Sequence, residues 1–230
     1  MPHSTPGLRR PLAASAALLG LLTLAGCGSG VSDASALGGE ARPPAYPGRI
    51  TLNSDPPGAR CILTNTSDGS RVAEVTTPAQ VPLPRSTAII EAACTAPGHL
   101  DTAMALRPVR DFADGIHHPQ PIGTGVAQNA VAVRTGSTRR YTDATVVLPP
   151  QSFPSVEARD AWFADRAAAI RAAAAPGIAR AQRAPNATID TPEVLQGYLA
   201  ADLAALDRQK AAATVAAPAA GPEPPARRRR

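Results

Sequence analysis

The stretch that decides the fold is residues 50–65, ITLNSDPPGARCILTN. Ile50 and Leu52 alternate with polar neighbours, which is the pattern of a strand with one buried face. Asp55-Pro56-Pro57-Gly58 is a turn signal, because proline presets the backbone and glycine adopts conformations closed to other residues. The run from Ala59 to Asn65 then indicates another strand. The segment therefore predicts two strands joined by a tight turn.

The strand pattern continues beyond this segment. Further short runs of strand-forming residues lie between turn signals, at residues 71–75, 86–95, 99–106 and 142–148. Short strands separated by turns are typical of a small antiparallel β-sandwich. We expect this domain to cover residues 49–150, with an irregular, glycine- and proline-containing insertion at 111–140.

Three turns also carry a resemblance. Ser54-Asp55-Pro56-Pro57-Gly58-Ala59, Thr77-Pro78 and Gly98-His99 occur in this order over about 60 residues. They resemble the turns of the PEGA-type β domain of bacterial surface proteins, which usually has an aromatic residue where His99 stands. The resemblance implies a β domain working outside the cytoplasm, and it implies no reaction.

A helical segment, residues 151–211, is expected to follow the sandwich. Ser155 is a suitable N-cap for a helix that reaches about Ala175 and ends at Pro176-Gly177. Thr191-Pro192-Glu193 starts a second helix, with proline at its first position. One face of each helix is apolar. The pattern leaves open whether these faces pack on the sheet, on each other or on a partner.

Residues 1–26 are organised as a signal peptide. Arg9 and Arg10 precede an apolar stretch of 14 residues, which is shorter than the ~20 residues of a spanning helix. The stretch ends in Leu24-Ala25-Gly26-Cys27, which resembles the lipobox of bacterial lipoproteins. The resemblance implies cleavage after Gly26 and a palmitate-type lipid anchor on Cys27. An ordinary signal peptide followed by a chance cysteine is the alternative, and the two arginines leave twin-arginine export open.

The residue after Cys27 bears on the destination. Gly28 stands where an inner-membrane retention signal usually has aspartate, so the resemblance implies the outer membrane, facing the periplasm. The serine-, glycine- and proline-rich residues 27–48 show no periodicity and predict a flexible tether. Residues 212–230, which end in Arg227 to Arg230, predict a disordered basic tail.

With Cys27 assigned to lipid, Cys61 and Cys94 remain as an even pair. Both fall in predicted strands with their side chains facing the core, and an oxidising periplasm would let them form a disulfide. Two buried free thiols are the alternative. A metal site is disfavoured, because two cysteines do not complete a zinc shell.

Charge and composition narrow the function. The net charge of +5 becomes −1 without Arg9, Arg10 and the four terminal arginines, so the middle of the chain lacks the basic face that nucleic-acid binding needs. No catalytic constellation, phosphate loop or cofactor motif appears. The sequence predicts a non-catalytic, membrane-anchored envelope lipoprotein that binds another envelope protein or peptidoglycan. A small-ligand-binding lipoprotein is the alternative, although so few large apolar residues make a pocket hard to line.

Overall fold

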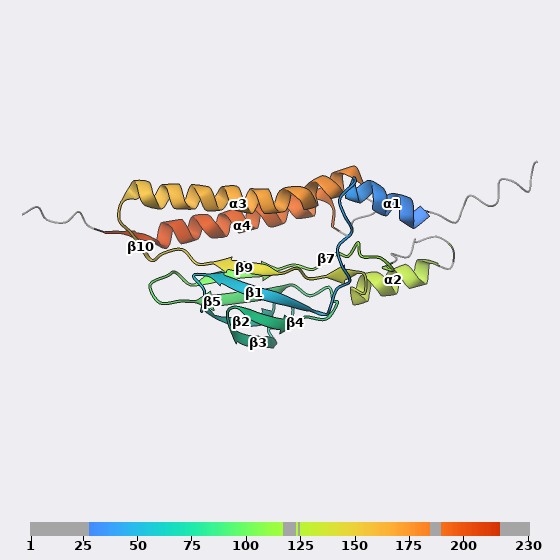
Figure 1. The fold of residues 1–230 in the computed structure, drawn as a ribbon, viewed down its shortest axis with the longest axis horizontal. Helices are drawn as coiled ribbons and strands as arrows, with labels where there is room; N and C mark the ends of the chain where they lie inside the picture. Colours follow the sequence, from blue (N-terminus) through green and yellow to red (C-terminus); the bar gives the residue numbers. More distant parts are fainter. Residues whose placement is uncertain (1–27, 117–122, 124, 185–189, 217–230) are drawn as a thin grey trace, which may run out of the picture.

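The computed structural model describes residues 28–116, 123, 125–184 and 190–216. Two small β-sheets lie face to face. Two long helices, α3 (Val156–Arg183) and α4 (Pro192–Ala212), run antiparallel along one side of them (Figure 1). The fold is mainly β with α, as the sequence predicted. No helix among the described residues is long and apolar enough to cross a membrane.

Seven strands build the two sheets: β1 (Arg49–Asp55), β2 (Arg60–Asn65), β3 (Arg71–Thr76), β4 (Ala79–Pro82), β5 (Ile90–Thr95), β6 (Thr102–Leu106) and β9 (Ala144–Val147). The larger sheet has the order β3-β2-β5-β6, and all its neighbours are antiparallel. The smaller has the order β4-β1-β9, in which β1 is antiparallel to β4 and parallel to β9. The parallel pair and β4 are additions to the predicted sandwich.

The core lies between the two sheets. Because successive side chains of a strand point to opposite faces, every second residue is buried. Ile50 and Leu52 of β1 face Cys61 and Leu63 of β2, and all four side chains are at most 1% exposed. The alternation that defined residues 50–65 in the sequence is therefore the alternation that builds the core.

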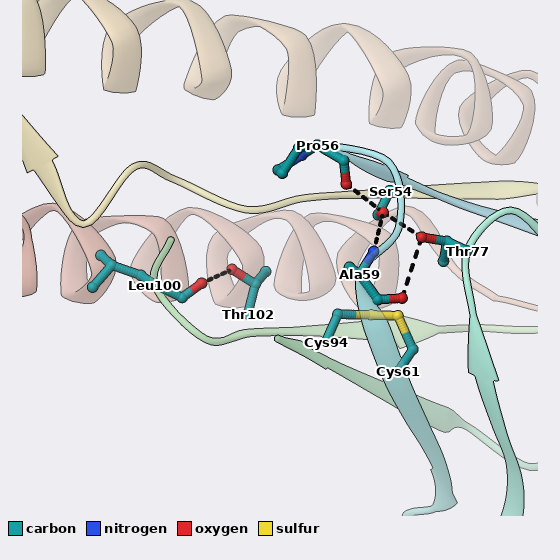
Figure 2. Close-up of a disulfide and its surroundings, with 8 residues drawn as sticks. All are labelled: Ser54, Pro56, Ala59, Cys61, Thr77, Cys94, Leu100 and Thr102. Carbon is teal, nitrogen blue, oxygen red and sulfur yellow. Dashed lines mark hydrogen bonds between the residues drawn. A yellow bond between two sulfur atoms is a disulfide. The ribbon is translucent and has the colours of Figure 1, made fainter. Parts of the chain in front are cut away.

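A buried pair of hydroxyl groups joins two turns inside the sandwich (Figure 2). The hydroxyl of Ser54 contacts that of Thr77 and donates to the carbonyl oxygen of Pro56 at 2.5 Å. The hydroxyl of Thr77 also bonds to the carbonyl oxygen of Ala59 at 3.3 Å. The turn after β1 and the corner before β4 are thus held by one polar junction.

Replacing Thr77 with valine tests this junction. The substitution keeps the shape of the side chain but takes a partner from the Ser54 hydroxyl and the Ala59 carbonyl. We expect the free energy of unfolding to fall by about 1–3 kcal/mol in urea denaturation. Thr145→Val is the control, because Thr145 is an exposed threonine of β9 and its replacement should change stability by less than about 0.5 kcal/mol. Equal losses in the two variants would contradict the junction's role.

The segment predicted as a flexible tether, 27–48, contains helix α1 (Gly28–Leu37). Ala36 and Leu37 are buried against Phe112. The carboxylate of Asp33 binds the guanidinium of Arg110 at 2.8 Å. Tertiary contacts therefore stabilise a helix that the local sequence does not predict. Cys27, the predicted lipidation site, lies outside the described residues.

The prediction of an irregular insertion at 111–140 was wrong, because the insertion contains helix α2 (Gly125–Thr135). The glycines and prolines around this helix favoured a loop, although residues 126–133 are mostly valine and alanine. Gly136 ends the helix with a left-handed φ of +67°. A Cβ atom at this position would lie 2.3 Å from the carbonyl carbon of Ser86, so only glycine fits.

Gly136→Ala should therefore destabilise the protein through two effects. The left-handed backbone alone costs an alanine about 1–2 kcal/mol, and the contact with Ser86 adds to this loss. Gly69→Ala is the matched control, since Gly69 has a φ of +71° but nothing within 4 Å of the added Cβ. Chemical denaturation should show the larger loss for Gly136→Ala. A loss no greater than that of Gly69→Ala would contradict the packing of α2 against the sandwich.

The two long helices begin where the sequence predicted. The Ser155 hydroxyl accepts a hydrogen bond from the amide of Ala158 at 3.2 Å, and the Thr191 hydroxyl accepts one from Val194 at 3.4 Å. However, α3 continues past Pro176, its predicted end, to Arg183. Proline removes one helical hydrogen bond. The turns after Pro176 are held by contacts of Arg180 and Arg183 with the segment before β1.

Four very short strands complete the fold of the described residues. β7 (Val109–Arg110) pairs with β8 (Arg139–Arg140), and β10 (Ser152–Phe153) pairs in parallel with β11 (Thr214–Val215). Because β11 follows α4 directly, residues 213–216 belong to the folded part rather than to a tail that begins at 212. Residues 217–230, with the terminal arginines, lie outside the described residues.

Candidate functional site

An aromatic cluster fastens one end of the α3–α4 hairpin to the sandwich. Phe153 of β10, Phe163 of α3 and Leu206 of α4 are all buried together. The ring centroids of Phe153 and Phe163 are 5.8 Å apart, and that of Trp162 is 4.8 Å from that of Phe163. The first turns of α3 and the last turns of α4 are thereby fixed against β10.

Helix α1 fastens the other end of α3. The guanidinium of Arg183 donates to the carbonyl oxygen of Ala36 at 2.8 Å. Arg180 forms an ion pair with Glu40 at 2.7 Å. The chain just before the sandwich therefore holds the last turns of α3, which explains why the helix persists beyond Pro176.

Between these two attachments lies an open cavity of about 440 Å³. Its walls come from β6 and β9 on one side and from α3 and α4 on the other. They include Met104, Leu106, Ala144, Ala169, Ala173, Ala174, Gly177, Ile178, Leu195, Tyr198 and Leu199. The volume falls in the range of ~300–1,000 Å³ that is usual for small-molecule sites.

A second cavity of about 160 Å³ adjoins the first. Both are lined by Met104, Arg107, Arg166, Ile170 and Asp202. The smaller cavity lies toward the end of α4 and the larger toward its beginning, so the space runs along the hairpin. We call the two cavities together the hairpin groove.

Small side chains leave this space open. The middle of α3 is rich in alanine, at residues 167–169 and 172–175. Of these alanines, Ala169, Ala173 and Ala174 line the groove. A methyl group ends close to its own helix backbone, so these three leave the space toward β6 and β9 open. From the sequence, the shortage of large apolar residues was expected to make a pocket hard to line. In the structure the shortage has the opposite effect, because small side chains keep the groove unfilled.

The groove lies over the edges of both sheets. β6 is the last strand of the larger sheet, and β9 is the last strand of the smaller one. The side-chain amide of Gln209 in α4 donates to the hydroxyl of Thr102 in β6 at 2.8 Å. Covering an edge strand with a helix protects it from pairing with other chains. The hairpin thus has a structural role as well as forming a wall of the groove.

Arg107 links the two walls. Its guanidinium binds both carboxylate oxygens of Asp202, at 2.8 and 2.9 Å, and lies 4.5 Å from the ring centroid of Tyr198. Two parallel hydrogen bonds fix the orientation of both side chains. Arg107 is therefore engaged within the protein and positions α4 over β6.

Arg166 differs from Arg107. It projects from α3, lines both cavities and is half-buried. Among the described residues, no carboxylate lies within 4 Å of its guanidinium. Burial lowers the pKa of Arg166, and the charge of Asp55 partly raises it again. Arginine stays protonated in proteins, so the groove contains a cation that has no ion-pair partner within 4 Å among the described residues, although the charge of Asp55 acts on it.

A second group of charged residues holds β8 to the sandwich. Asp111 is fully buried and lies 2.5 Å from Arg85 and 3.6 Å from Arg140. It also accepts a hydrogen bond from the amide of Ala113 at 2.9 Å. With its oxygens occupied in this way, Asp111 is a structural ion-pair centre rather than a reactive group.

Asp111→Asn should destabilise the protein, because the guanidinium groups of Arg85 and Arg140 keep their charge and lose the carboxylate. A hydrogen bond to a charged group is worth about 1.5–3 kcal/mol, and we expect a loss of this size in chemical denaturation. Asp165→Asn is the control, since Asp165 is exposed. An Asp111→Asn variant as stable as this control would contradict the structural role.

The predicted disulfide residues, Cys61 and Cys94, face each other across β2 and β5 (Figure 2). Their Sγ atoms are 2.01 Å apart, so they lie at disulfide distance. Both are buried in the sandwich core, and neither lines the hairpin groove. They are structural residues rather than part of the candidate site.

Sequence reasoning did not find Arg107, Arg166 or Asp202. The available signal was weak, an arginine among alanines on α3 with Ile170 one turn later.

Within the described ranges, no group of three or more histidine, cysteine, aspartate or glutamate side chains is placed to hold a metal ion. Comparisons with protein-family models, curated proteins and solved structures found no match. Function is therefore inferred from the sequence motifs and the hairpin groove.

Proposed function

We propose that the chain is an exported, lipid-anchored protein of the bacterial cell envelope that binds another envelope component and catalyses no reaction. The lipobox-like Leu24-Ala25-Gly26-Cys27 is the observation that carries this proposal. The cysteine pair Cys61 and Cys94 supports it, because disulfides persist in oxidising compartments such as the periplasm.

The hairpin groove is the proposed binding site for a small ligand. α1 begins at the residue after Cys27 and holds the last turns of α3. Ten helical residues span about 15 Å. A lipid on Cys27 would therefore keep the groove close to the membrane surface, where it meets both membrane-derived and periplasmic ligands.

Two kinds of ligand fit this role. A partner protein or peptidoglycan would bind to the outer surface of the hairpin or the sandwich. A small molecule would enter the groove, and the cavity of about 440 Å³ is the observation that favours it. The small-ligand alternative thus gains support that the sequence did not offer.

Anchoring is tested with the full chain expressed in a bacterial host. We expect the wild-type protein in the membrane fraction, with an intact mass that matches an acylated chain starting at Cys27. Cys27→Ser should lose the acyl mass, and Ser29→Ala, two residues away, should keep it. A wild-type protein that retains residues 1–26 without lipid would contradict the proposal.

A further inference from the structure

We propose that the hairpin groove binds a single-chain anionic amphiphile, with its carboxylate on Arg166 and its hydrocarbon chain along the alanine-lined wall of α3. This inference rests on the small-ligand alternative proposed above and specifies the class of that ligand.

Pairing among the charges that line the groove leaves Arg166 as the contact for an anion. Arg107 is paired with Asp202, and Arg180 with Glu40. Asp190 lies 3.5 Å from Arg139. The exposed Asp143 accepts the amide of Thr51 at 2.7 Å. Arg166 is the arginine of the groove whose guanidinium has no carboxylate within 4 Å among the described residues.

Partial burial makes that position favourable for a ligand carboxylate. A guanidinium that has lost part of its water gains more from an opposite charge than one in bulk solvent. Only one such cation lines the groove within the described part of the chain. A polyanion such as a nucleotide would need several, so a single negative charge fits best.

The other residues that line the groove favour a ligand with a narrow, apolar hydrocarbon part. From Arg166 to Gly177 the helix rises about 16 Å, and the wall between them presents Ala169, Ala173 and Ala174. Leu195 and Leu199 of α4 face the same cavity. An unbranched chain would bury its surface against these side chains, with its head group at the junction of the two cavities.

The head-group contact is tested by titration. The full chain, purified from membranes into nanodiscs of neutral phosphatidylcholine, is titrated with octanoate labelled with ¹³C at the carboxyl carbon, and separately with 1-octanol. We expect saturable one-to-one binding, tighter for octanoate. Arg166→Gln should weaken octanoate binding about tenfold or more and leave octanol unchanged. Arg171→Gln, an exposed arginine of the same helix, should change neither.

The proposed site of the hydrocarbon chain is tested by filling the groove beside α3 with a larger side chain. A Cβ atom on Gly177 meets nothing within 4 Å, so Gly177→Leu places a side chain in open groove space. Replacing a glycine inside a helix also favours the helix. We expect Gly177→Leu to abolish octanoate binding. Gly197→Leu, at an exposed glycine of α4 outside the groove, gains the same helix propensity and should bind as the wild type does.

Two results would overturn the inference. Equal octanoate uptake by the wild type, Arg166→Gln and Gly177→Leu would mean partition into the bilayer alone. Loss of binding in Gly177→Leu with no effect of Arg166→Gln would mean a neutral ligand. Neither result bears on the anchor, which the mass of the wild-type chain tests separately. If the purified protein carries no lipid, the same titration with octanoate and 1-octanol is made in buffer without nanodiscs.

Discussion

The hairpin of α3 and α4 is attached to the sandwich at its ends and by the pair of Arg107 with Asp202 in the middle of α4. Among the described residues, no buried apolar cluster fills the space between α3 and β6. Phe153 and Phe163 fix one end, and the bond from Arg183 to the carbonyl of Ala36 helps to fix the other. Because these contacts carry the attachment, alanines in the middle of α3 need not reach β6. The open groove and its half-buried Arg166 both depend on this arrangement.

Polar and covalent links supplement a small apolar core. After Gly26 the chain has 36 leucine, isoleucine, valine and phenylalanine residues among 204, fewer than one in five. The Cys61–Cys94 pair joins neighbouring strands, the hydroxyls of Ser54 and Thr77 join two turns, and Asp111 joins arginines from separate segments. Each link is buried and partnered, which is the condition under which a polar group does not destabilise an interior.

The sequence predicted what local patterns control. The alternation around Ile50 and Leu52 was enough for the strands, and Ser155 and Thr191 were enough for the helix starts. It did not predict α1 or α2, nor the continuation of α3 past Pro176. Contacts such as that between Asp33 and Arg110, which lie 77 residues apart, decide those elements. The groove was missed for the same reason, because it depends on where α3 lies relative to β6.

Our proposal of an envelope protein that holds a small amphiphilic acid combines the proposed lipid anchor on Cys27 with an apolar groove. Among the described residues, the guanidinium of Arg166 in this groove has no carboxylate within 4 Å. Native mass spectrometry of the full chain extracted from cell envelopes tests this claim most directly. We predict a non-covalently bound single-chain acid on the wild-type protein and none on Gly177→Leu. A wild-type protein with no bound species, or the same species at equal occupancy on both proteins, would contradict it.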